Sequence, residues 1–420
     1  MKRGFYTIMA AQFFSSLADN ALLIAAIALL IEMHAPDWMK PLLKLFFTIS
    51  YVMLAPFVGA FADSMPKGRV MLITNSIKVI GCALMFASYH PLLAYAVVGF
   101  GAAAYSPAKY GILTELLPPE KLVAANGWIE GTTVSSIILG TVLGGVLISP
   151  RVSAGLLGLD LPHIDTGIDS PAESAIAVIA GVYALAALFN FWIPDTGARY
   201  PRQQTNPLRL VADFSKCLGM LWRDKLGQIS LAVTTMFWGA GATLQFIVLK
   251  WADVQLGMPL SRAAILQGVV ALGIAVGAVV AARFVPLKGS LRVLPFGVAM
   301  GVLVPMMTLV HTLPVAYATL VLIGGMAGFF VVPMNALLQH RGHVLMSAGH
   351  SIAVQNFNEN LMILAMLALY AVLIRADVHI NTVIVLFGSF VAVTMLGVIR
   401  LHRANQARFD SVALIGQSRH

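Results

Sequence analysis

The chain has 420 residues, of which 59% are hydrophobic and only 11% are charged, whereas a soluble domain has roughly 25% charged residues. Apolar stretches of about 18 to 25 residues recur along its whole length, and each can cross about 30 Å of hydrocarbon as a helix. This composition excludes a soluble globular protein and predicts an all-α membrane protein.

Taken in chain order, the apolar stretches predict twelve transmembrane helices. Their ends are blurred by glycines, prolines and short loops, so the number of spans is better defined than their boundaries. We expect the spans near residues 5–32, 42–62, 70–88, 91–110, 124–148, 174–193, 228–251, 263–285, 291–311, 315–338, 347–374 and 381–401.

The first apolar stretch follows Lys2 and Arg3, a beginning that is typical of a secretory signal peptide. Asp19 and Asn20 interrupt this stretch, and no convincing small-residue cleavage site follows it. We therefore expect a retained first helix.

The basic residues predict the orientation of the chain. With both termini in the cytoplasm, most of the 27 lysines and arginines lie on the inner side, and the outer side holds only Lys40, Lys44, Arg151, Lys250, Arg262 and Arg375. This distribution obeys the positive-inside rule. Anionic lipid headgroups then account for the net charge of +9 without a nucleic-acid partner. We predict a multi-pass protein of a bacterial inner membrane with both termini cytoplasmic.

Two halves of the sequence repeat. Residues 99–115 align without gaps on residues 325–341, which brings Pro107 over Pro333. An amide followed four residues later by glutamate occurs in both halves, as Asn126 with Glu130 and as Gln355 with Glu359. Two copies of a six-helix unit explain both matches.

The repeat predicts four segments. These are an N-terminal six-helix half (residues 1–193), a cytoplasmic linker (194–227), a C-terminal six-helix half (228–402) and a cytoplasmic tail (403–420). Within the linker, apolar residues recur at helical spacing, which predicts an amphipathic helix lying on the membrane. They are Leu208, Val211, Phe214, Leu218 and Leu221.

Two parallel six-helix repeats with an inside linker are typical of the major facilitator architecture, whose substrate site lies between the halves near the bilayer midplane. The sequence GAFADSMPKGR, residues 59–69, resembles the signature of that superfamily between its second and third spans. It departs from the signature at Ser64, where a basic residue is usual.

A closer resemblance covers almost the whole chain. The segments FFSSLADNALL (13–23), APFVGAFADSMPKGRV (55–70), VGFGAAAYSPAKYGIL (98–113), FWGAGATL (237–244), GFFVVPMNALLQ (328–339) and AVQNFNEN (353–360) resemble the bacterial lysophospholipid transporter family. The resemblance implies a facilitator that brings lysophospholipids, chiefly lysophosphatidylethanolamine, from the outer to the inner leaflet for reacylation. A lysolipid acyltransferase would then be a functional partner. Gln245 stands where some relatives are expected to have an arginine.

Ionisable residues inside the spans are the main candidates for function, because each costs roughly 2.5 to 3.5 kcal/mol at the centre of a membrane helix. Asp19, beside Asn20, could bind an ammonium headgroup, a proton or a sodium ion, or could be a buried partner for Lys78. Lys78 could pair with Asp19, extend toward the membrane surface or bind a phosphate. These alternatives remain open at the level of sequence.

The second candidate stretch lies in the eleventh span. Glu359 stands among Gln355, Asn356, Asn358 and Asn360, too many polar groups to face lipid, so the stretch is expected to line a cavity. The predicted substrate-binding residues are Asp19, Asn20, Gln245, Asn335, Gln355, Asn358 and Glu359.

Charged residues near the predicted cytoplasmic ends are candidates for a gate. Asp63, Lys67 and Arg69 could hold an inner gate shut, or could form a simple positive-inside loop. Lys109 and Glu115 could form a similar latch or a solvated helix end. Glu130 could serve either a gate or the substrate.

No enzyme is predicted, because the sequence has no nucleophile elbow, metal-ligand spacing or phosphate-cradling loop. The two cysteines suggest neither a disulfide nor a zinc site, and no cofactor is expected. The predicted function is lysophospholipid transport by alternating access. The alternative is a drug exporter driven by protons, in which Asp19 and Glu359 would carry the proton.

Overall fold

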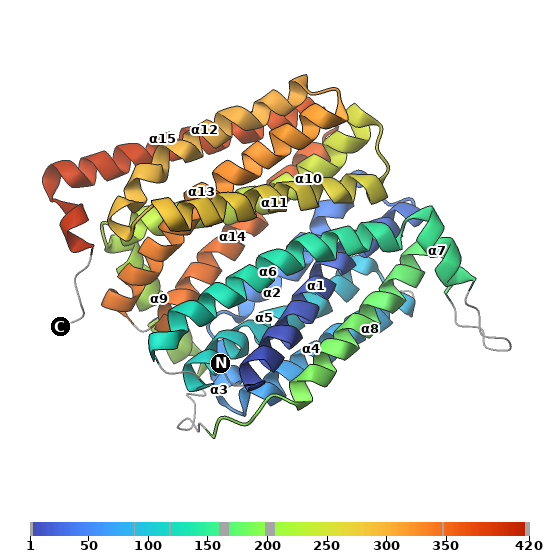
Figure 1. Ribbon diagram of the computed structural model, residues 1–420, viewed down its shortest axis with the longest axis horizontal. Coiled ribbons are helices and arrows are strands. Elements are labelled where there is room, and N and C mark those ends of the chain that lie inside the picture. The colour runs from blue at the N-terminus through green and yellow to red at the C-terminus, as the bar shows by residue number, and fades with distance from the viewer. Residues whose placement is uncertain are drawn as a thin grey trace. The chain divides into compact units, whose positions relative to one another are not determined.

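The computed structural model describes residues 3–87, 89–116, 119–158, 168–197, 206–346 and 348–415. Every regular element in these residues is a helix (Figure 1). The chain divides into two compact units. Unit 1 contains Met1–Pro207 with Pro259–Gly268, and unit 2 contains Leu208–Met258 with Val269–His420.

Unit 1 contains eight α-helices. They are α1 (Arg3–Glu32), α2 (Lys40–Leu54), α3 (Val58–Asp63), α4 (Lys67–Phe86), α5 (Pro91–Leu116), α6 (Pro119–Leu147), α7 (Pro150–Leu157) and α8 (Pro171–Phe191), with a short 3₁₀ turn at Asp37–Met39. Local sequence explains several ends. Helix α8, for example, begins with a complete capping box between Ser170 and Glu173, and Pro171 follows the cap.

Unit 2 contains the remaining helices, except that the first part of α11, up to Gly268, belongs to unit 1. They are α9 (Pro207–Arg223), α10 (Gly227–Leu256), α11 (Leu260–Phe284), α12 (Leu294–Leu303), α13 (Leu313–Leu345), α14 (Ala348–Arg375) and α15 (Ile380–Arg408), with 3₁₀ turns at Leu287–Val293, Val304–Leu309 and Ser411–Leu414. Helix α10 ends at Gly257, which adopts a left-handed conformation with φ of 60°.

Glycines allow close helix contacts in both units. A Cβ atom added at Gly144 of α6 would lie 2.8 Å from the Ala21 carbonyl oxygen of α1, so only glycine permits this approach. In unit 2, a Cβ atom at Gly277 of α11 would collide with the Gly325 carbonyl oxygen of α13. Small residues in membrane helices commonly have this role.

The helices of the two units pair in the same order. In unit 1, α1 packs on α6 and α8, α4 packs on α5 and α8, and α2 packs on α5. In unit 2, α10 packs on α14 and α15, and α12 packs on α13 and α15. The glycine contacts of α11 with α13 correspond to the contact of α2 with α5. The sequence repeat is thus matched by a repeated packing scheme.

The expected spans correspond to observed helices, with one break. Ten described helices are long and apolar enough to cross a membrane, and a bent pair, Gly131–Leu147 with Pro150–Leu157, is an eleventh candidate. The span expected near 42–62 is divided into two helices. That segment forms α2 and α3, separated at Ala55–Phe57, because Pro56 has no N–H to continue the helix.

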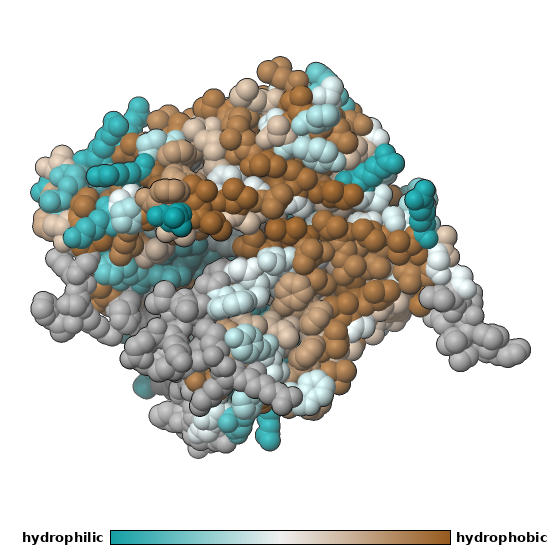
Figure 2. Space-filling model, in the orientation of Figure 1, coloured by the Kyte–Doolittle hydropathy of each residue, from teal (hydrophilic) through white to brown (hydrophobic). Residues whose placement is uncertain are grey.

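Exposed apolar side chains cover the outside of the helices. On α11, large hydrophobic residues are well exposed, among them Leu272, Val276, Val279 and Phe284. In Figure 2 the hydrophobic colour runs along α11, and hydrophilic residues gather at helix ends. Such a surface is unfavourable in water and suits contact with lipid chains.

Apolar residues of the linker helix α9 pack on unit 2. Phe214, Leu218 and Leu221 lie in a core cluster with residues of α10, α13 and α14. Leu221 is fully buried in this cluster. The first turn of α9 is different, since Leu208 remains exposed. These contacts make the helix part of unit 2. The expected contact of this helix with the membrane surface remains a prediction.

Candidate functional site

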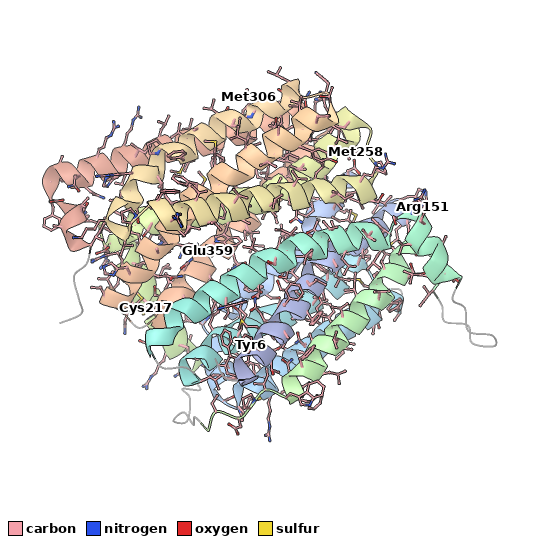
Figure 3. The ribbon with its side chains drawn as sticks, in the orientation of Figure 1. Tyr6, Arg151, Cys217, Met258, Met306 and Glu359 are labelled. Atoms are coloured by element: carbon pink, nitrogen blue, oxygen red, sulfur yellow. The ribbon has the colours of Figure 1, made fainter. Side chains whose placement is uncertain are left out.

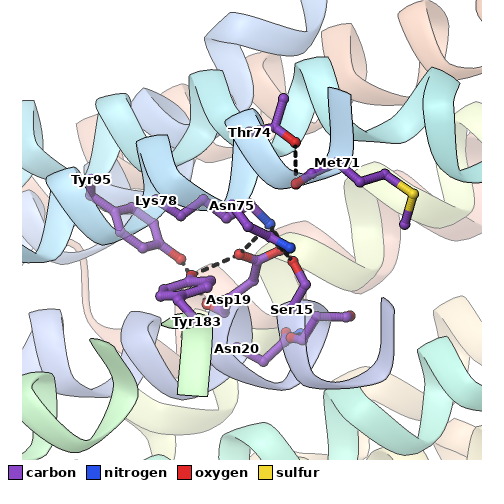
Figure 4. Close-up of polar contacts among 10 residues, drawn as sticks. Ser15, Asp19, Asn20, Met71, Thr74, Asn75, Lys78, Tyr95 and Tyr183 are labelled. Atoms are coloured by element: carbon purple, nitrogen blue, oxygen red, sulfur yellow. Dashed lines mark hydrogen bonds and ion pairs between the residues drawn. The ribbon is translucent and has the colours of Figure 1, made fainter. Parts of the chain in front are cut away.

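A polar cluster lies inside the apolar core of unit 1, near the middle of α1 (Figure 4). Helix α1 contributes Ser15 and Asp19, one helical turn apart, and α4 contributes Asn75 and Lys78 with similar spacing. Because residues three or four apart share a helix face, each pair points in one direction. We call this group the Asp19 cluster; its tyrosines are Tyr95, Tyr105 and Tyr183.

The centre of the Asp19 cluster is an ion pair. The Lys78 ammonium nitrogen lies 2.9 Å from both carboxylate oxygens of Asp19. The Lys78 side chain is only 1% exposed, whereas that of Asp19 is 20% exposed. Removing one partner of such a pair leaves a buried charge uncompensated and typically costs about 3 to 5 kcal/mol.

Hydrogen bonds fix the orientation of both charged groups. The Tyr183 hydroxyl donates to Asp19 Oδ1 at 2.7 Å, and the Tyr95 hydroxyl donates to the Asp19 carbonyl oxygen at 3.2 Å. Lys78 also donates to Ser15 Oγ at 2.9 Å. The aromatic rings of Tyr105 and Tyr183 lie 5.2 and 5.5 Å from the ammonium nitrogen, within the range of a cation–π contact.

The pairing answers part of the question left open by the sequence. The sequence left three alternatives for Lys78, and the structure shows the first of them, the ion pair with Asp19. A role for Asp19 in binding substrate is compatible with this pair and remains a prediction. Asn20, predicted beside it, donates to the Ser16 carbonyl oxygen of its own helix at 2.8 Å.

A second polar group lies in unit 2, where Glu359 stands on α14 (Figure 3). The Gln355 side-chain amide donates to Glu359 Oε1 at 2.7 Å and to Asn335 Oδ1 of α13 at 3.2 Å. The Glu359 side chain is 6% exposed. The structure thus brings together three of the predicted residues, Asn335, Gln355 and Glu359. Gln245, on α10, is half-buried.

Asn358 has a different environment from its neighbour Glu359. Its Oδ1 accepts a hydrogen bond of 3.1 Å from the Trp222 indole of α9, and its amide nitrogen donates to the Val354 carbonyl oxygen at 2.7 Å. Next to it, the Phe357 ring packs edge to face on Phe214 of α9. Asn358 therefore connects α14 to the linker helix.

The predicted gate residues are only partly described. Lys67 is buried at the start of α4, and its ammonium donates to the Ala62 carbonyl oxygen of α3 at 2.8 Å. Arg69 is exposed. Lys109 lies 4.4 Å from the centroid of the Tyr110 ring. The side chains of Asp63, Glu115 and Glu130 lie outside the described residues.

Sequence reasoning missed a buried ion pair between α13 and the segment after α9. The Arg341 guanidinium binds both carboxylate oxygens of Asp224, at 3.0 and 2.5 Å. Asp224 Oδ1 also accepts from the backbone N–H groups of Leu226 and Gly227, where α10 begins. The internal repeat could have drawn attention to Arg341, because Arg341 aligns with Glu115, which was predicted as a gate residue.

Sequence reasoning also missed the uncharged members of the Asp19 cluster. Ser15 and Asn75 each lie one turn from a charged residue that was predicted, so helical spacing was a usable signal. Tyr95, Tyr105 and Tyr183 gave no signal, because a tyrosine in an apolar span is usually a packing residue.

Comparisons with known proteins agree with this architecture. The family model of the Major Facilitator Superfamily matches residues 8–366. The chain is 43% identical over 381 residues to the Lysophospholipid transporter LplT of Yersinia enterocolitica, covering 90% of this chain and 89% of that protein. It is 41% identical over 396 residues to the protein of the same name from Photorhabdus laumondii, covering 94% of each.

The chain belongs to the lysophospholipid transporter family of the Major Facilitator Superfamily. As a facilitator it also resembles solved transporters in fold. A POT family transporter in complex with 5-aminolevulinic acid matches with a TM-score of 0.71 at 12% identity, covering 96% of this chain and 97% of that one. A bacterial homolog of the human lysosomal transporter Spinster, in an inward-facing conformation, matches with a TM-score of 0.62 at 15% identity, covering 98% of both chains.

Proposed function

We propose that this facilitator moves lysophospholipids, chiefly lysophosphatidylethanolamine, from the outer to the inner leaflet of a bacterial inner membrane by alternating access. The observation that carries the proposal is the identity of 41% and 43%, over about nine tenths of the chain, to proteins named as lysophospholipid transporters. Both termini would lie in the cytoplasm.

The two polar groups are suited to a zwitterionic headgroup. Asp19 would take part in binding its cationic part, and the amides beside Glu359 supply both donors and acceptors. The proposed substrate-binding residues are Asp19, Asn20, Gln245, Asn335, Gln355, Asn358 and Glu359. The acyl chain would remain against apolar helix surface, because each methylene exposed to water costs about 0.8 kcal/mol.

The proposed gate consists of Asp63, Lys67, Arg69, Lys109, Glu115 and Glu130. The Lys67 bond to the Ala62 carbonyl oxygen supports this, because it ties the end of α3 to the start of α4. Such a contact can stabilise one transport state only as far as it differs between states.

Reacylation would restore a diacyl lipid from the transported lysolipid, as the resemblance to the family implies. A lysolipid acyltransferase on the inner side is therefore the proposed functional partner. The chain itself is proposed to catalyse no covalent step, which agrees with relatives that are named as transporters.

Uptake by spheroplasts tests the proposal. Cells lacking their own lysolipid transport would be given this protein and labelled lysophosphatidylethanolamine, with and without a sodium or proton gradient. We expect uptake that depends on the protein and is followed by conversion to the diacyl lipid. Absence of uptake in spheroplasts that contain the protein in their membrane would refute the proposal.

The rival function is proton-driven drug export, which is favoured by the presence of carboxylates at Asp19 and Glu359 inside the helices. An exporter would lower the accumulation of cationic dyes in a proton-dependent manner. It would leave lysolipid uptake unchanged.

A further inference from the structure

Several buried hydrogen-bonding groups of unit 1 have no partner among the described residues, and two of them lie on helices α4 and α5. These two are the side-chain amide nitrogen of Asn75 and the hydroxyl of Tyr105. The Asn75 side chain is 0% exposed and that of Tyr105 is 5% exposed. Leaving such groups unpaired is costly, and nearly all buried polar groups in proteins are bonded. Their presence therefore needs an explanation.

Both unpaired groups lie beside Lys78. The centroid of the Tyr105 ring is 5.2 Å from the Lys78 ammonium nitrogen. Asn75 is joined to the same ammonium through Ser15, which accepts from Lys78 at 2.9 Å and donates to Asn75 Oδ1 at 2.7 Å (Figure 4). The two residues with unpaired groups, Asn75 of α4 and Tyr105 of α5, thus both neighbour the Lys78 side chain.

The hydrogen-bond chain fixes which end of the Asn75 amide is unpaired. Ser15 Oγ already accepts an N–H from Lys78, so its own proton is available to a second group. That group must be an acceptor, which assigns Oδ1 toward Ser15 and leaves the NH₂ group as the unpaired end. The unpaired amide group is therefore a donor with a fixed direction.

We propose that Lys78, Asn75 and Tyr105 form a phosphate-binding subsite for the lysolipid phosphodiester. The proposal rests on the proposed function and names the part of the substrate that the Asp19 cluster recognises. A phosphodiester presents anionic oxygens, each of which can accept several hydrogen bonds. One ammonium, one amide NH₂ and one hydroxyl supply a charge and two neutral donors to match it.

In the structure, the anion paired with the Lys78 ammonium is the Asp19 carboxylate. This carboxylate is the more exposed partner of the ion pair, 20% against 1% for Lys78, so an arriving anion meets the carboxylate first. Exchange of the carboxylate for the phosphate leaves Lys78 paired with an anion before and after binding. Asn75 and Tyr105 then gain an acceptor that the described residues do not supply. This exchange avoids an uncompensated buried cation at either stage.

The test uses variants that change only the unpaired groups. Tyr105→Phe removes one hydroxyl that has no hydrogen-bond partner among the described residues. Asn75→Asp keeps the acceptor for Ser15 and replaces the unpaired donor with an acceptor that repels phosphate. The matched control is Tyr370→Phe in unit 2, which removes a buried hydroxyl that donates to the Phe246 carbonyl oxygen, outside the Asp19 cluster.

Purified full-length protein would be titrated with two single-chain probes, lysophosphatidic acid, which has the phosphate, and monoacylglycerol, which lacks it. For Tyr105→Phe we expect affinity for lysophosphatidic acid to fall about tenfold, the loss of one good hydrogen bond to a charged group, with thermal stability unchanged or higher. Asn75→Asp should lose at least as much. Affinity for monoacylglycerol should stay the same in all variants.

Wild-type affinity for lysophosphatidic acid in Tyr105→Phe would overturn the subsite. An equal loss for both probes would overturn it as well, because that result means a general packing defect. Failure of the proposed function is seen separately, as absence of lysophosphatidylethanolamine uptake by the wild-type protein. The probe comparison judges the subsite in that case too, since it requires binding only.

Discussion

At the residue scale, Asp19 and Lys78 stabilise unit 1 as a buried ion pair, and the same two side chains are proposed to bind the substrate. We predict that Asp19→Asn lowers lysolipid uptake about ten- to one-hundredfold, because it removes the charge in the ion pair and weakens a charged hydrogen bond. Spheroplast uptake at matched membrane expression measures this. Normal transport by the variant would leave Asp19 a purely structural contact.

The stability of the same variant gives an independent test. Asp19→Asn leaves Lys78 as a buried cation without its anion, so the melting temperature should fall. The double variant Asp19→Asn with Lys78→Met removes both charges and should recover most of that loss without recovering transport. Melting curves of the purified variants in one detergent measure the recovery. A double variant less stable than the single one would contradict the ion-pair account.

Glu359 is the corresponding test in unit 2. Glu359→Gln should reduce uptake about tenfold or more through loss of a negative charge, while its side chain remains able to accept from Gln355. The matched control is Asn360→Ala, since the Asn360 amide donates to the Asn356 carbonyl oxygen of its own helix. If both variants transport as the wild type does, the polar stretch of α14 has no direct part in transport.

At the element scale, the contact between α11 and α13 depends on backbone approach. Gly277→Ala would place a Cβ atom against the Gly325 carbonyl oxygen, which cannot rotate away. We expect destabilisation of about 1 to 3 kcal/mol from overpacking, measured as a lower midpoint of thermal unfolding in detergent. In the control Gly241→Ala on α10, the new Cβ meets nothing within 4 Å, so that variant should be neutral or more stable.

The linker helix α9 supplies its own reporter, Cys217. Burial raises the pKa of the Cys217 thiol, and the Asp213 carboxylate adds to the rise, while Lys216 opposes it. The thiolate is the reactive form, so maleimide labelling should be slower than for an ordinary cysteine at neutral pH and should accelerate as pH rises. The other cysteine, Cys82, is fully buried.

Asp224→Asn should release α9 from unit 2. The change breaks the buried ion pair with Arg341 and weakens the bonds that begin α10. We predict faster maleimide labelling of Cys217 at a fixed pH, because the thiol becomes more exposed. Lys216→Gln, next to the cysteine but with an exposed side chain, controls for local charge. Unchanged labelling in Asp224→Asn would mean that the apolar cluster alone holds the helix.

At the scale of the whole molecule, the exposed apolar helix surface suits a substrate that keeps its tail in the membrane. Glycerophosphoethanolamine has the headgroup of the lysolipid without the acyl chain. It should compete poorly for uptake, since each buried methylene contributes about 0.8 kcal/mol. Competition assays with a series of chain lengths measure this dependence. Equal competition by the tailless compound would mean that the headgroup alone is recognised.

The sequence predicted the architecture well because its periodic signals are long. The twelve apolar stretches and the internal repeat are each defined by many residues. The repeated helix pairing agrees with the predicted repeat. The break at Pro56 and the docking of α9 depend on single contacts, which hydropathy averages away. From the sequence alone, the Phe214 side chain could contact either lipid or protein. The structure shows that it packs against the Phe357 ring.

The site was harder to predict than the fold. Charged residues such as Asp19 and Lys78 stand out in an apolar chain, so their importance was evident. The partner of each charged residue was not evident, because it depends on which helices are neighbours. Lys78 of α4 reaches Ser15 and Asp19 of α1 only in the folded unit. The tyrosines that complete the cluster are ordinary core residues by composition.

The docking of α9 has a consequence for dividing the chain into separately expressed fragments. A C-terminal fragment that begins at Gly227, after the linker, would lack the side chains that cover Leu231, Leu338 and Val354. It would also leave Arg341 buried without Asp224. A C-terminal fragment should therefore include α9 and begin no later than Pro207.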